Sequence, residues 1–321
     1  MVDPIIIILI IILLVLLIAL FIFGNYLFKI VFSRSNDLGE EIQEVDDSFK
    51  ESPFFAPTHK ELVIYNNIKK KEYKKLQFKT LTIKSYDNLT LYANYLDNNS
   101  DITIICVHGY KSNPIGDFCA IIEMYLERNY NVLLLENRGH CRSEGKYIGF
   151  SELDRFDIKS WVEKIHKLNP NMKVFLHGVS MGASSVVHTA DMDLDVKGII
   201  ADCGFTSILD ITKHLIKDMY GLPYFPFGEL ARLNAYLFNK VSFNKSNSKE
   251  IVKHTNIPIA FISGKDDGFV PAKMTIDTYN NCISKKYLLL VDGAGHAASY
   301  MKNSEAYKNI VYQLIDENKG E

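Results

Sequence analysis

The feature that most constrains this chain is the segment from Lys173 to Gly182, in which a short apolar run leads directly into Gly178-Val-Ser180-Met-Gly182. The run Val174-Phe-Leu176 is typical of a buried parallel strand, and the small and apolar residues after Met181 are typical of a helix. The segment therefore predicts a strand, a tight turn that carries a serine, and a helix. The flanking glycines permit the close approach of strand and helix that such a turn requires.

Composition alone would produce a G-x-S-x-G string by chance in about one chain of this length in twenty, so its context decides its value. The predicted turn presents the Ser180 hydroxyl at the carboxyl end of a sheet, where parallel α/β sheets place their functional groups. Ser180 is therefore a candidate nucleophile. A serine hydroxyl is hardly ionised at neutral pH, so it needs a neighbouring base.

The rest of the chain alternates between strand-like and helix-like segments. Strands are predicted at 78–84, 89–96, 102–107, 131–135, 174–176, 196–201, 257–262 and 286–291, and helices at 117–128, 152–168, after Met181 and at 304–317. The first two strands have the alternation of antiparallel edge strands, with Asp87-Asn88 at the turn. Strands separated by helix-length segments imply a mostly parallel sheet covered on both faces.

One interval, 206–256, is longer than a single helix with short loops, and it is rich in apolar and aromatic residues such as Leu215, Tyr224 and Phe227. A long insertion at the carboxyl edge of an α/β sheet is commonly a lid over the site. We expect a small cap lined with apolar groups, which suits an acyl or aromatic part of a substrate. The alternative is a longer helix pair packed on the core.

The N-terminal region contains an unbroken apolar run from Ile5 to Phe23. About 20 apolar residues cross the hydrocarbon core of a bilayer as a helix, so residues 1–32 are predicted to be a transmembrane anchor. A cleaved signal peptide is the competing interpretation, but the start of the chain lacks a basic region and no A-x-A site follows. Lys29 and Arg34 follow the span, and the positive-inside rule then favours a cytoplasmic domain over an external one.

Residues 33–60 are polar and acidic and are expected to form a spacer that keeps the following domain, 61–321, away from the bilayer. The basic cluster from Lys69 to Lys75 is interpreted as a solvated helix or turn face, with contact to anionic headgroups as the alternative. The formal net charge of -2 gives no argument for nucleic acid. Five cysteines without CxxC spacing are expected to be reduced core residues, which favours a reducing compartment.

Five stretches occur in a fixed order along the chain. They are His108-Gly-Tyr-Lys-Ser-Asn113, Asn137-Arg-Gly-His-Cys-Arg-Ser-Glu-Gly145, Gly178-Val-Ser-Met-Gly182, Gly264-Lys-Asp-Asp-Gly-Phe-Val-Pro271 and Gly293-Ala-Gly-His296. Together they resemble the motifs of the α/β-hydrolase superfamily, in particular its bacterial serine aminopeptidase-like, esterase and acyltransferase-like members. The resemblance covers about 78–317. It implies an α/β-hydrolase fold with a mostly parallel central sheet, helices on both faces and a small helical cap.

The resemblance, with its chain order of nucleophile, acid and histidine, implies a catalytic triad of Ser180, Asp267 and His296. His296 follows the last predicted strand on a glycine-rich loop that can bring an imidazole back over the sheet. Asp267 stands three residues before the valine of Val-Pro, where the family pattern has its acid. Asp266 and Asp202 remain alternatives for the acid, because both also follow predicted strands.

The same resemblance implies an oxyanion hole formed by the backbone N–H groups of Met181 and Tyr110. It implies no metal and no organic cofactor. The segment Arg138 to Gly145 is interpreted as a structural loop beside the site, with neither Cys141 as a second nucleophile nor His140-Cys141 as a metal pair.

The predicted function is that of a membrane-anchored serine hydrolase, which cleaves an ester, thioester or amide through an acyl-enzyme. The apolar cap favours esterase or lipase-like activity on a small-molecule acyl substrate. A serine aminopeptidase-like peptidase is the alternative, with Glu229 as the candidate group for a substrate amine. A non-catalytic hydrolase-like binding module is the alternative of another class, and acyl transfer to an acceptor other than water shares the same acyl-enzyme. The oligomeric state stays open.

Overall fold

A computed structural model describes residues 3–38 and 58–320, and its centre is a sheet with the strand order β1-β2-β4-β3-β5-β6-β7-β8. The strands are β1 (Lys79–Lys84), β2 (Thr90–Leu96), β3 (Ile102–Val107), β4 (Asn131–Leu135), β5 (Lys173–Val179), β6 (Gly198–Asp202), β7 (Ile259–Gly264) and β8 (Lys286–Val291). Strand β2 is antiparallel to β1 and β4, and the other neighbours are parallel. The predicted mostly parallel sheet with antiparallel edge strands is confirmed.

Two apolar clusters cover the two faces of the sheet, because successive side chains along a strand point to opposite faces. In β3, for example, Ile104 and Cys106 belong to one cluster and Ile105 and Val107 to the other. The first face is covered by α3 (Pro114–Phe118), α4 (Ile122–Glu127), α11 (Ser299–Lys302) and α12 (Ser304–Asn318), and the second by α5 (Asp154–Leu168), α6 (Met181–Val187), α9 (Ser248–Ile251) and α10 (Ala272–Asn281). Burial on both faces explains why the central strands are continuous apolar runs.

One predicted helix differs from the structure. The segment expected as a single helix over 117–128 forms the two short helices α3 and α4, separated by a turn. The first helix starts earlier than expected because Asn113 caps it by accepting a hydrogen bond from the Gly116 N–H, 2.7 Å away, and Pro114 follows at the first helical position. This early start determines where the loop before α3 ends. That loop borders the candidate site.

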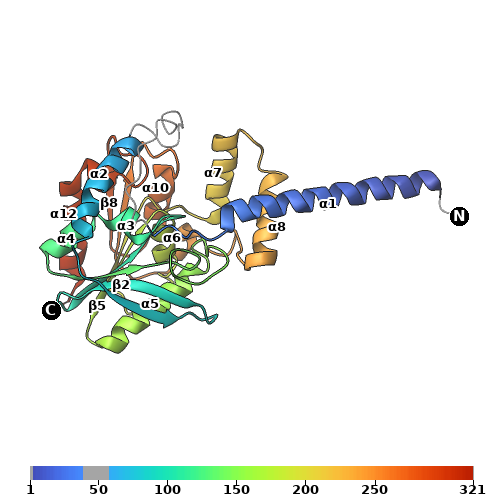
Figure 1. The fold of residues 1–321 in the computed structure, drawn as a ribbon. Helices are drawn as coiled ribbons and strands as arrows, with labels where there is room; N and C mark the ends of the chain where they lie inside the picture. Colours follow the sequence, from blue (N-terminus) through green and yellow to red (C-terminus); the bar gives the residue numbers. More distant parts are fainter. Residues whose placement is uncertain (1–2, 39–57, 321) are drawn as a thin grey trace.

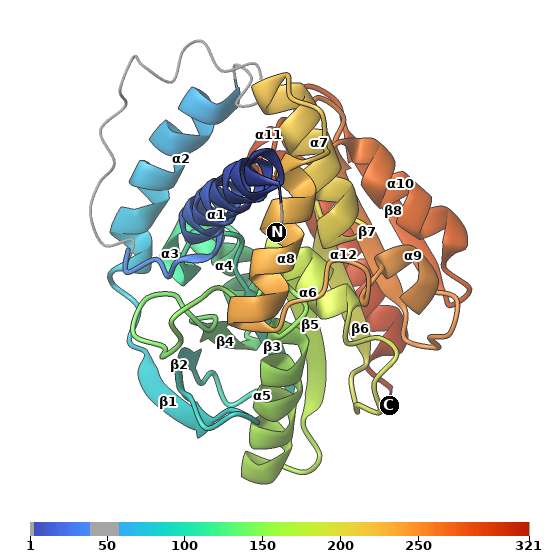
Figure 2. The ribbon, with the colours of Figure 1, turned by 90° about the vertical axis from the view of Figure 1, so that its right-hand side faces the viewer.

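The N-terminal run forms one long helix, α1 (Pro4–Phe32), which is long and apolar enough to cross a membrane. Its residues 5–23 are exposed, whereas Gly24, Phe28 and Phe32 are buried against the domain. The predicted cap region contains α7 (Ile208–Tyr220) and α8 (Phe227–Asn239), and α8 packs directly on α1. Figure 1 shows α8 crossing α1 where α1 leaves the domain, and Figure 2 looks along α1 and places it beside the cap helices.

The start of the predicted spacer does not lie free of the domain. Ser33 pairs with Tyr147, the Ser35 N–H donates to the Gly139 carbonyl at 2.8 Å, and the Arg34 guanidinium donates to the Cys141 carbonyl at 2.8 Å. Residues 33–38 are therefore part of the folded domain, because their backbone groups find partners in the loop 139–147. The remainder of the predicted spacer, 39–57, lies outside the described residues.

The predicted basic cluster lies at the end of helix α2 (Thr58–Tyr73) and just beyond it. It is not a uniformly solvated face, since Lys70 is buried and Lys69 forms an ion pair of 2.6 Å with Glu123 of α4. These two lysines attach α2 to the domain, while Lys75 pairs locally with Glu72 at the exposed end.

Candidate active site

Ser180 lies at the junction of β5 and α6, where the sequence places the G-x-S-x-G turn. Its φ of 56° and ψ of −118° lie outside the regions that most side chains adopt, so its backbone is strained. An added Cβ at Gly178 would collide with the backbone of Gly182, and one at Gly182 would collide with the carbonyl of Val107. The two glycines are needed because strand and helix approach each other so closely, and this approach pushes Ser180 out at the end of the sheet.

Ser180, His296 and Asp267 form one hydrogen-bonded chain. The Ser180 hydroxyl donates to His296 Nε2 at 2.8 Å, and His296 Nδ1–H donates to Asp267 Oδ2 at 2.7 Å. The other carboxylate oxygen of Asp267 accepts the backbone N–H groups of Phe269 and Val270 at 2.9 and 2.8 Å. These two bonds fix the carboxylate, and the carboxylate in turn fixes which imidazole nitrogen carries the proton.

The charge of Asp267 also sets the protonation of the imidazole. Burial by itself lowers the pKa of His296, but the negative charge of Asp267 and its hydrogen bond oppose burial and hold that pKa well above its ordinary value. The positive form of the imidazole is therefore stabilised at the position where it would form during proton transfer from Ser180.

Neither alternative acid contacts the imidazole. Asp202 is buried beneath the site and accepts hydrogen bonds from Tyr307 OH at 3.1 Å and Ser299 Oγ at 3.3 Å, and burial raises its pKa to about 7. Asp266 is exposed, and its backbone N–H donates to the Ala294 carbonyl at 3.0 Å. Of the three candidate acids, the structure brings only Asp267 to His296.

The loop after β3 lies against Ser180, since a Cβ at Gly109 would stand 3.1 Å from the Cβ of Ser180. The Gly109 N–H donates to Asp117 Oδ2 at 2.6 Å, and Ser112 Oγ donates to Asp117 Oδ1 at 2.6 Å. Asp117, which the sequence analysis did not single out, thus holds the loop that carries Tyr110. On the other side, Met181 begins α6, so its N–H has no partner within the helix.

Four other buried histidines, His108, His140, His177 and His188, are held as neutral structural groups. Burial lowers the pKa of His177 and of His188 to about 3 and that of His140 to about 4, and it lowers the pKa of His108 well below its ordinary value. His177, for example, lies between the hydroxyls of Tyr125 at 2.6 Å and Tyr307 at 2.9 Å. Their surroundings explain why only the histidine after the last strand reaches Ser180.

Burial also accounts for the cysteines, all of which are free and buried. It raises the pKa of Cys141 to about 12, so its thiol is a poor nucleophile. Within residues 3–38 and 58–320, one group of side chains is close enough to share a metal ion, namely Cys203, Asp267 and His296. Both imidazole nitrogens of His296 are already engaged in hydrogen bonds, so this group does not offer a set of free ligands.

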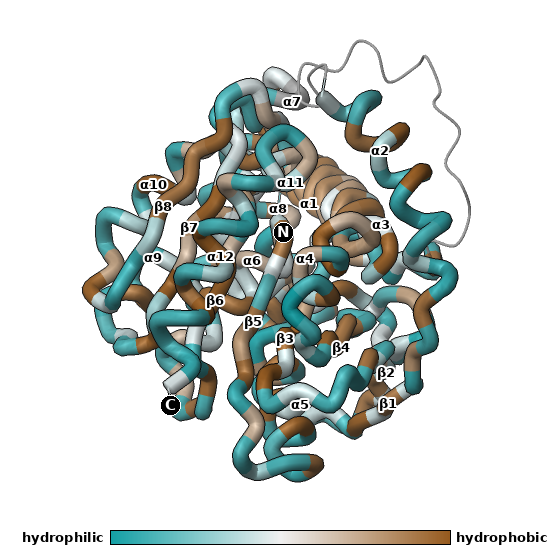
Figure 3. The backbone as a smooth tube through the Cα atoms, turned by 90° about the vertical axis from the view of Figure 1, so that its left-hand side faces the viewer, coloured by the Kyte–Doolittle hydropathy of each residue, from teal (hydrophilic) through white to brown (hydrophobic). Residues whose placement is uncertain are grey.

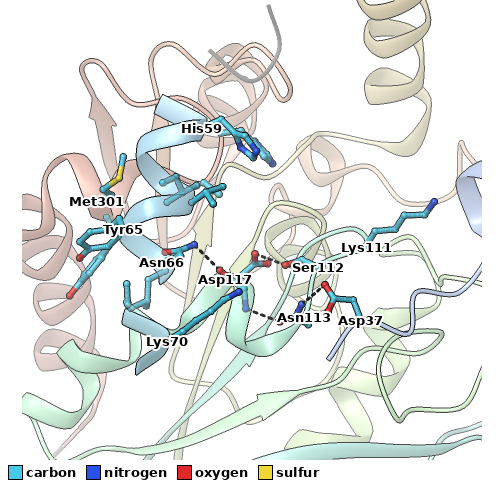
Figure 4. Close-up of a pocket in the computed structure, with 18 residues that line it drawn as sticks. Asp37, His59, Tyr65, Asn66, Lys70, Lys111, Ser112, Asn113, Asp117 and Met301 are labelled. Atoms are coloured by element: carbon cyan, nitrogen blue, oxygen red, sulfur yellow. Dashed lines mark hydrogen bonds between the residues drawn. The ribbon is translucent and has the colours of Figure 1, made fainter. Parts of the chain in front are cut away.

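Two cavities that differ in polarity border this chain of hydrogen bonds. The larger one, of about 430 Å³, has Ser180 and Met181 in its wall and is otherwise mostly apolar, with Leu27 of α1 and Leu215 of α7 among its lining residues. The smaller one, of about 240 Å³, has His296 in its wall together with polar side chains. Figure 4 shows polar groups of this cavity: His59, Asn66 and Lys70 on α2, Asn113 on the loop before α3, and Asp117 on α3. Lys111 borders both cavities.

The sequence analysis missed that α1 forms part of the larger cavity. Phe23, Leu27, Ile30 and Val31 of α1 all line it. One signal was available, because α1 has 29 residues and, at about 1.5 Å per residue, is longer than the roughly 30 Å hydrocarbon core requires. The helical turns of α1 in excess of that thickness are therefore available to pack on the domain.

The chain is similar to several known proteins. A family model described as serine aminopeptidase matches residues 98–241, which include β3 to α8 and the turn at Ser180. The uncharacterized protein YqkD of Bacillus subtilis is 26% identical over 220 residues, which cover 67% of this chain and 71% of that protein. Protein bem46 of Schizosaccharomyces pombe is 25% identical over 223 residues, which cover 66% of this chain and 68% of that protein.

Two solved structures show the same fold. The Pyrococcus furiosus esterase Pf2001 superposes with a TM-score of 0.65 at 23% identity and covers 78% of this chain and 94% of its own. The ferulic acid complex of Est1E from Butyrivibrio proteoclasticus superposes with a TM-score of 0.60 at 20% identity and covers 74% of this chain and 98% of its own. The strand order and these superpositions show that the chain has the α/β-hydrolase fold.

Proposed function

We propose that the protein is a serine hydrolase that cleaves acyl esters. The hydrogen-bonded chain from Ser180 through His296 to Asp267, placed in the wall of an apolar cavity, carries this proposal. Ser180 Oγ bonds to the substrate carbonyl carbon while His296 Nε2 takes the hydroxyl proton, and Asp267 stabilises the imidazolium. The bond to the leaving oxygen then breaks, and His296 returns the proton to that oxygen. Water attacks the acyl-enzyme in the same way and releases the carboxylic acid.

The negative oxygen of the tetrahedral intermediate needs preorganised donors. We assign this role to the backbone N–H groups of Met181 and Tyr110. The position of Met181 at the start of α6 and the contact of the Gly109 loop with Ser180 support the assignment. Only main-chain atoms are involved, so the side chains at these two positions serve other purposes.

The lining of the larger cavity favours an ester substrate over an amino-terminal peptide. Among the described residues in its wall, Lys111 is the only charged one, so that wall offers no carboxylate to a substrate amine. Glu229, the candidate for that role, pairs with Arg232 on the exposed side of α8 and does not line the cavity.

We further propose that α1 is a retained membrane anchor and not a cleaved leader, with the following domain in the cytoplasm. Retention is supported by the last turns of α1, which are buried in the domain and would leave the cavity open if they were removed. Orientation rests on Lys29 and Arg34, which lie at the domain end of the helix. Protease accessibility in vesicles of known orientation tests the side, and the length of the purified chain tests retention.

The function is tested by fluorophosphonate labelling of the full-length protein in detergent, beside Ser180→Ala and His296→Ala. We expect labelling to require Ser180 and to fall strongly without His296, and we expect Ser180→Ala to lower kcat on p-nitrophenyl esters by about a thousandfold or more. Ser160→Ala, which removes an unrelated hydroxyl on α5, is the matched control. Faster cleavage of aminoacyl anilides would favour the peptidase. A folded wild-type protein that takes no label would favour the non-catalytic binding module.

A further inference from the structure

The helix that is long enough to cross a membrane is also a wall of the cavity that contains Ser180. Residues 5–23 of α1 are exposed and apolar, and at about 1.5 Å per residue they span close to the roughly 30 Å of a bilayer core. The next turns continue into the domain without a break, and Leu27, Ile30 and Val31 face the cavity. The hydrocarbon-facing span and a wall of the apolar cavity therefore belong to one element. Figure 3 shows the hydrophobic colouring of α1.

The cap adds an exposed apolar surface at the same place. This surface, here called the cap patch, consists of Leu222, Phe225, Leu233, Tyr236, Leu237 and Phe238, all of them large and exposed. Phe225, on the segment between α7 and α8, is 75% exposed. The patch joins the span directly, because Phe238 lies 6.4 Å from Phe21, and the neighbouring Phe227 lies 6.1 Å from Phe23, between ring centroids.

The direction of α1 determines what covers this patch. If residues 5–23 lie in the bilayer, then α8, which crosses α1 at the end of that stretch (Figure 1), lies along the membrane surface. Large exposed apolar side chains on a helix in that position are typical of insertion at the headgroup boundary. The cavity, which Phe227 and Ala231 of α8 also line, then borders the acyl region of the nearest leaflet.

The two cavities also differ in the hydrogen-bonding groups that they offer, since the smaller one has polar side chains among its apolar ones. An acyl chain suits the apolar cavity, while the polar cavity on the His296 side offers hydrogen-bonding groups such as Asn66 and Asn113. The loop between them is tied to α1, because Tyr110 OH donates to the Val31 carbonyl and Lys111 Nζ to the Ile30 carbonyl, both at 2.7 Å. A molecule held across Ser180 would thus be apolar on the membrane side and polar on the other.

We propose that the substrate is a membrane amphiphile, a long-chain acyl ester with a polar leaving group, whose chain enters the apolar cavity from the bilayer alongside α1 and the cap patch. The leaving group occupies the polar cavity. This inference rests on the proposed function, since it names the substrate class and the entry route of the same serine site. The anchor then serves as a wall of the binding site as well as an attachment.

The test uses the full-length protein in phosphatidylcholine–phosphatidylglycerol vesicles that carry a palmitoyl-labelled phospholipid, mixed with protein-free vesicles that carry a second label. We expect fatty acid release from the protein's own vesicles to exceed release from the others by about a hundredfold, because the anchor raises the effective concentration of the first substrate. Equal release from both populations would overturn the membrane route. The membrane route would also be overturned if no fatty acid is released in these vesicles although Ser180 takes fluorophosphonate label and a soluble butyrate ester is cleaved. Loss of both labelling and butyrate cleavage would instead contradict the proposed function.

A pair of neighbouring variants separates the cavity wall from the anchor. Leu27→Trp places a large ring in the apolar cavity, whereas Tyr26→Trp changes an exposed residue of α1 that does not line it. We expect Leu27→Trp to lower the ratio of palmitoyl to butyryl ester kcat/KM by about tenfold, as steric restriction of an apolar pocket commonly does. Tyr26→Trp should leave that ratio unchanged. Fluorophosphonate labelling reports that each variant is folded, and equal ratios in the labelled variants would contradict the assignment of α1 as a wall.

Discussion

The apolar cavity has two walls that are built in different ways. On the sheet side, Ser180 and Met181 are positioned by backbone contacts so close that Gly178 and Gly182 have no room for a side chain. On the side of α1 and the cap, contacts are between apolar side chains, such as the stacked rings of Phe28 and Phe32 at 5.0 Å. Proton transfer needs atoms at hydrogen-bond distance, whereas an acyl chain needs only a dry surface. The sheet side should therefore tolerate far less change.

The largest expected effect is on the sheet side. Asp267→Asn keeps the shape of the acid but removes the charge that selects the imidazole tautomer, so we expect kcat/KM on esters to fall by about a thousandfold or more. Asp266→Asn, an exposed neighbour that does not contact His296, should change it by less than about twofold. Equal effects of the two variants would contradict the assignment of Asp267.

The dependence of kcat/KM on pH tests the assignment of Asp267 in a second way. Catalysis needs a neutral imidazole, so activity falls as the pH decreases through the pKa of His296. Asp267 raises that pKa, so the acid limb of the wild-type profile should have its midpoint above the ordinary value of about 6.5. In Asp267→Asn the residual activity should extend to lower pH, because the stabilising charge is gone. A limb that does not move would show that another group controls it.

The next effect is on folding. Gly182→Ala introduces a Cβ that meets the backbone carbonyls of Val107 and His108, which cannot turn aside as a flexible side chain could. We expect a loss of about 3 kcal/mol or more in the free energy of unfolding. Thermal unfolding of the full-length protein, followed by the fluorescence of Trp161, the only tryptophan, measures it.

A smaller effect is expected where the two walls are joined. Tyr110→Phe keeps the backbone N–H but removes the hydroxyl that donates to the Val31 carbonyl of α1. We expect about 1 kcal/mol of destabilisation and a fall in kcat on long-chain esters of a few fold. A variant with wild-type stability and activity would mean that the loop needs no support from α1.

The smallest effect is expected on the side of α1. A Cβ at Gly24 would lie 2.7 Å from Asn234 Nδ2 and 3.2 Å from Leu230 Cβ, both of which are side-chain atoms of α8. The Asn234 amide is the end of a side chain and can turn, while Leu230 Cβ needs only a small shift of α8. Alanine favours a helix over glycine by about 1 kcal/mol, so Gly24→Ala should change the unfolding free energy by no more than that. A loss as large as that of Gly182→Ala would remove the difference between the two walls.

Much of the sheet could be predicted because its signals are local. The bounds expected for the strands at 102–107, 131–135 and 286–291 agree with the structure, since each is a continuous apolar run between polar turns. The split of the helix at 117–128 was not predicted, because a cap at Asn113 and a turn at Cys119 leave the apolar spacing nearly unchanged. Asp117 was missed because its role depends on Gly109 and Ser112, which fold back onto it.

The sequence by itself determined the mostly parallel α/β class and the turn at Ser180, because strand periodicity and turn glycines act over a few residues. The order of nucleophile, acid and histidine came from the resemblance to α/β-hydrolases. It also determined that the N-terminal run is long and apolar enough to span a membrane. Only the tertiary structure decided that Asp267 and not Asp202 faces His296, that residues 33–38 join the domain, and that α1 lines the cavity of Ser180. The length and apolar composition of α1 indicate that it must be removed from water. Only the tertiary packing determines whether lipid or the rest of the protein covers each turn.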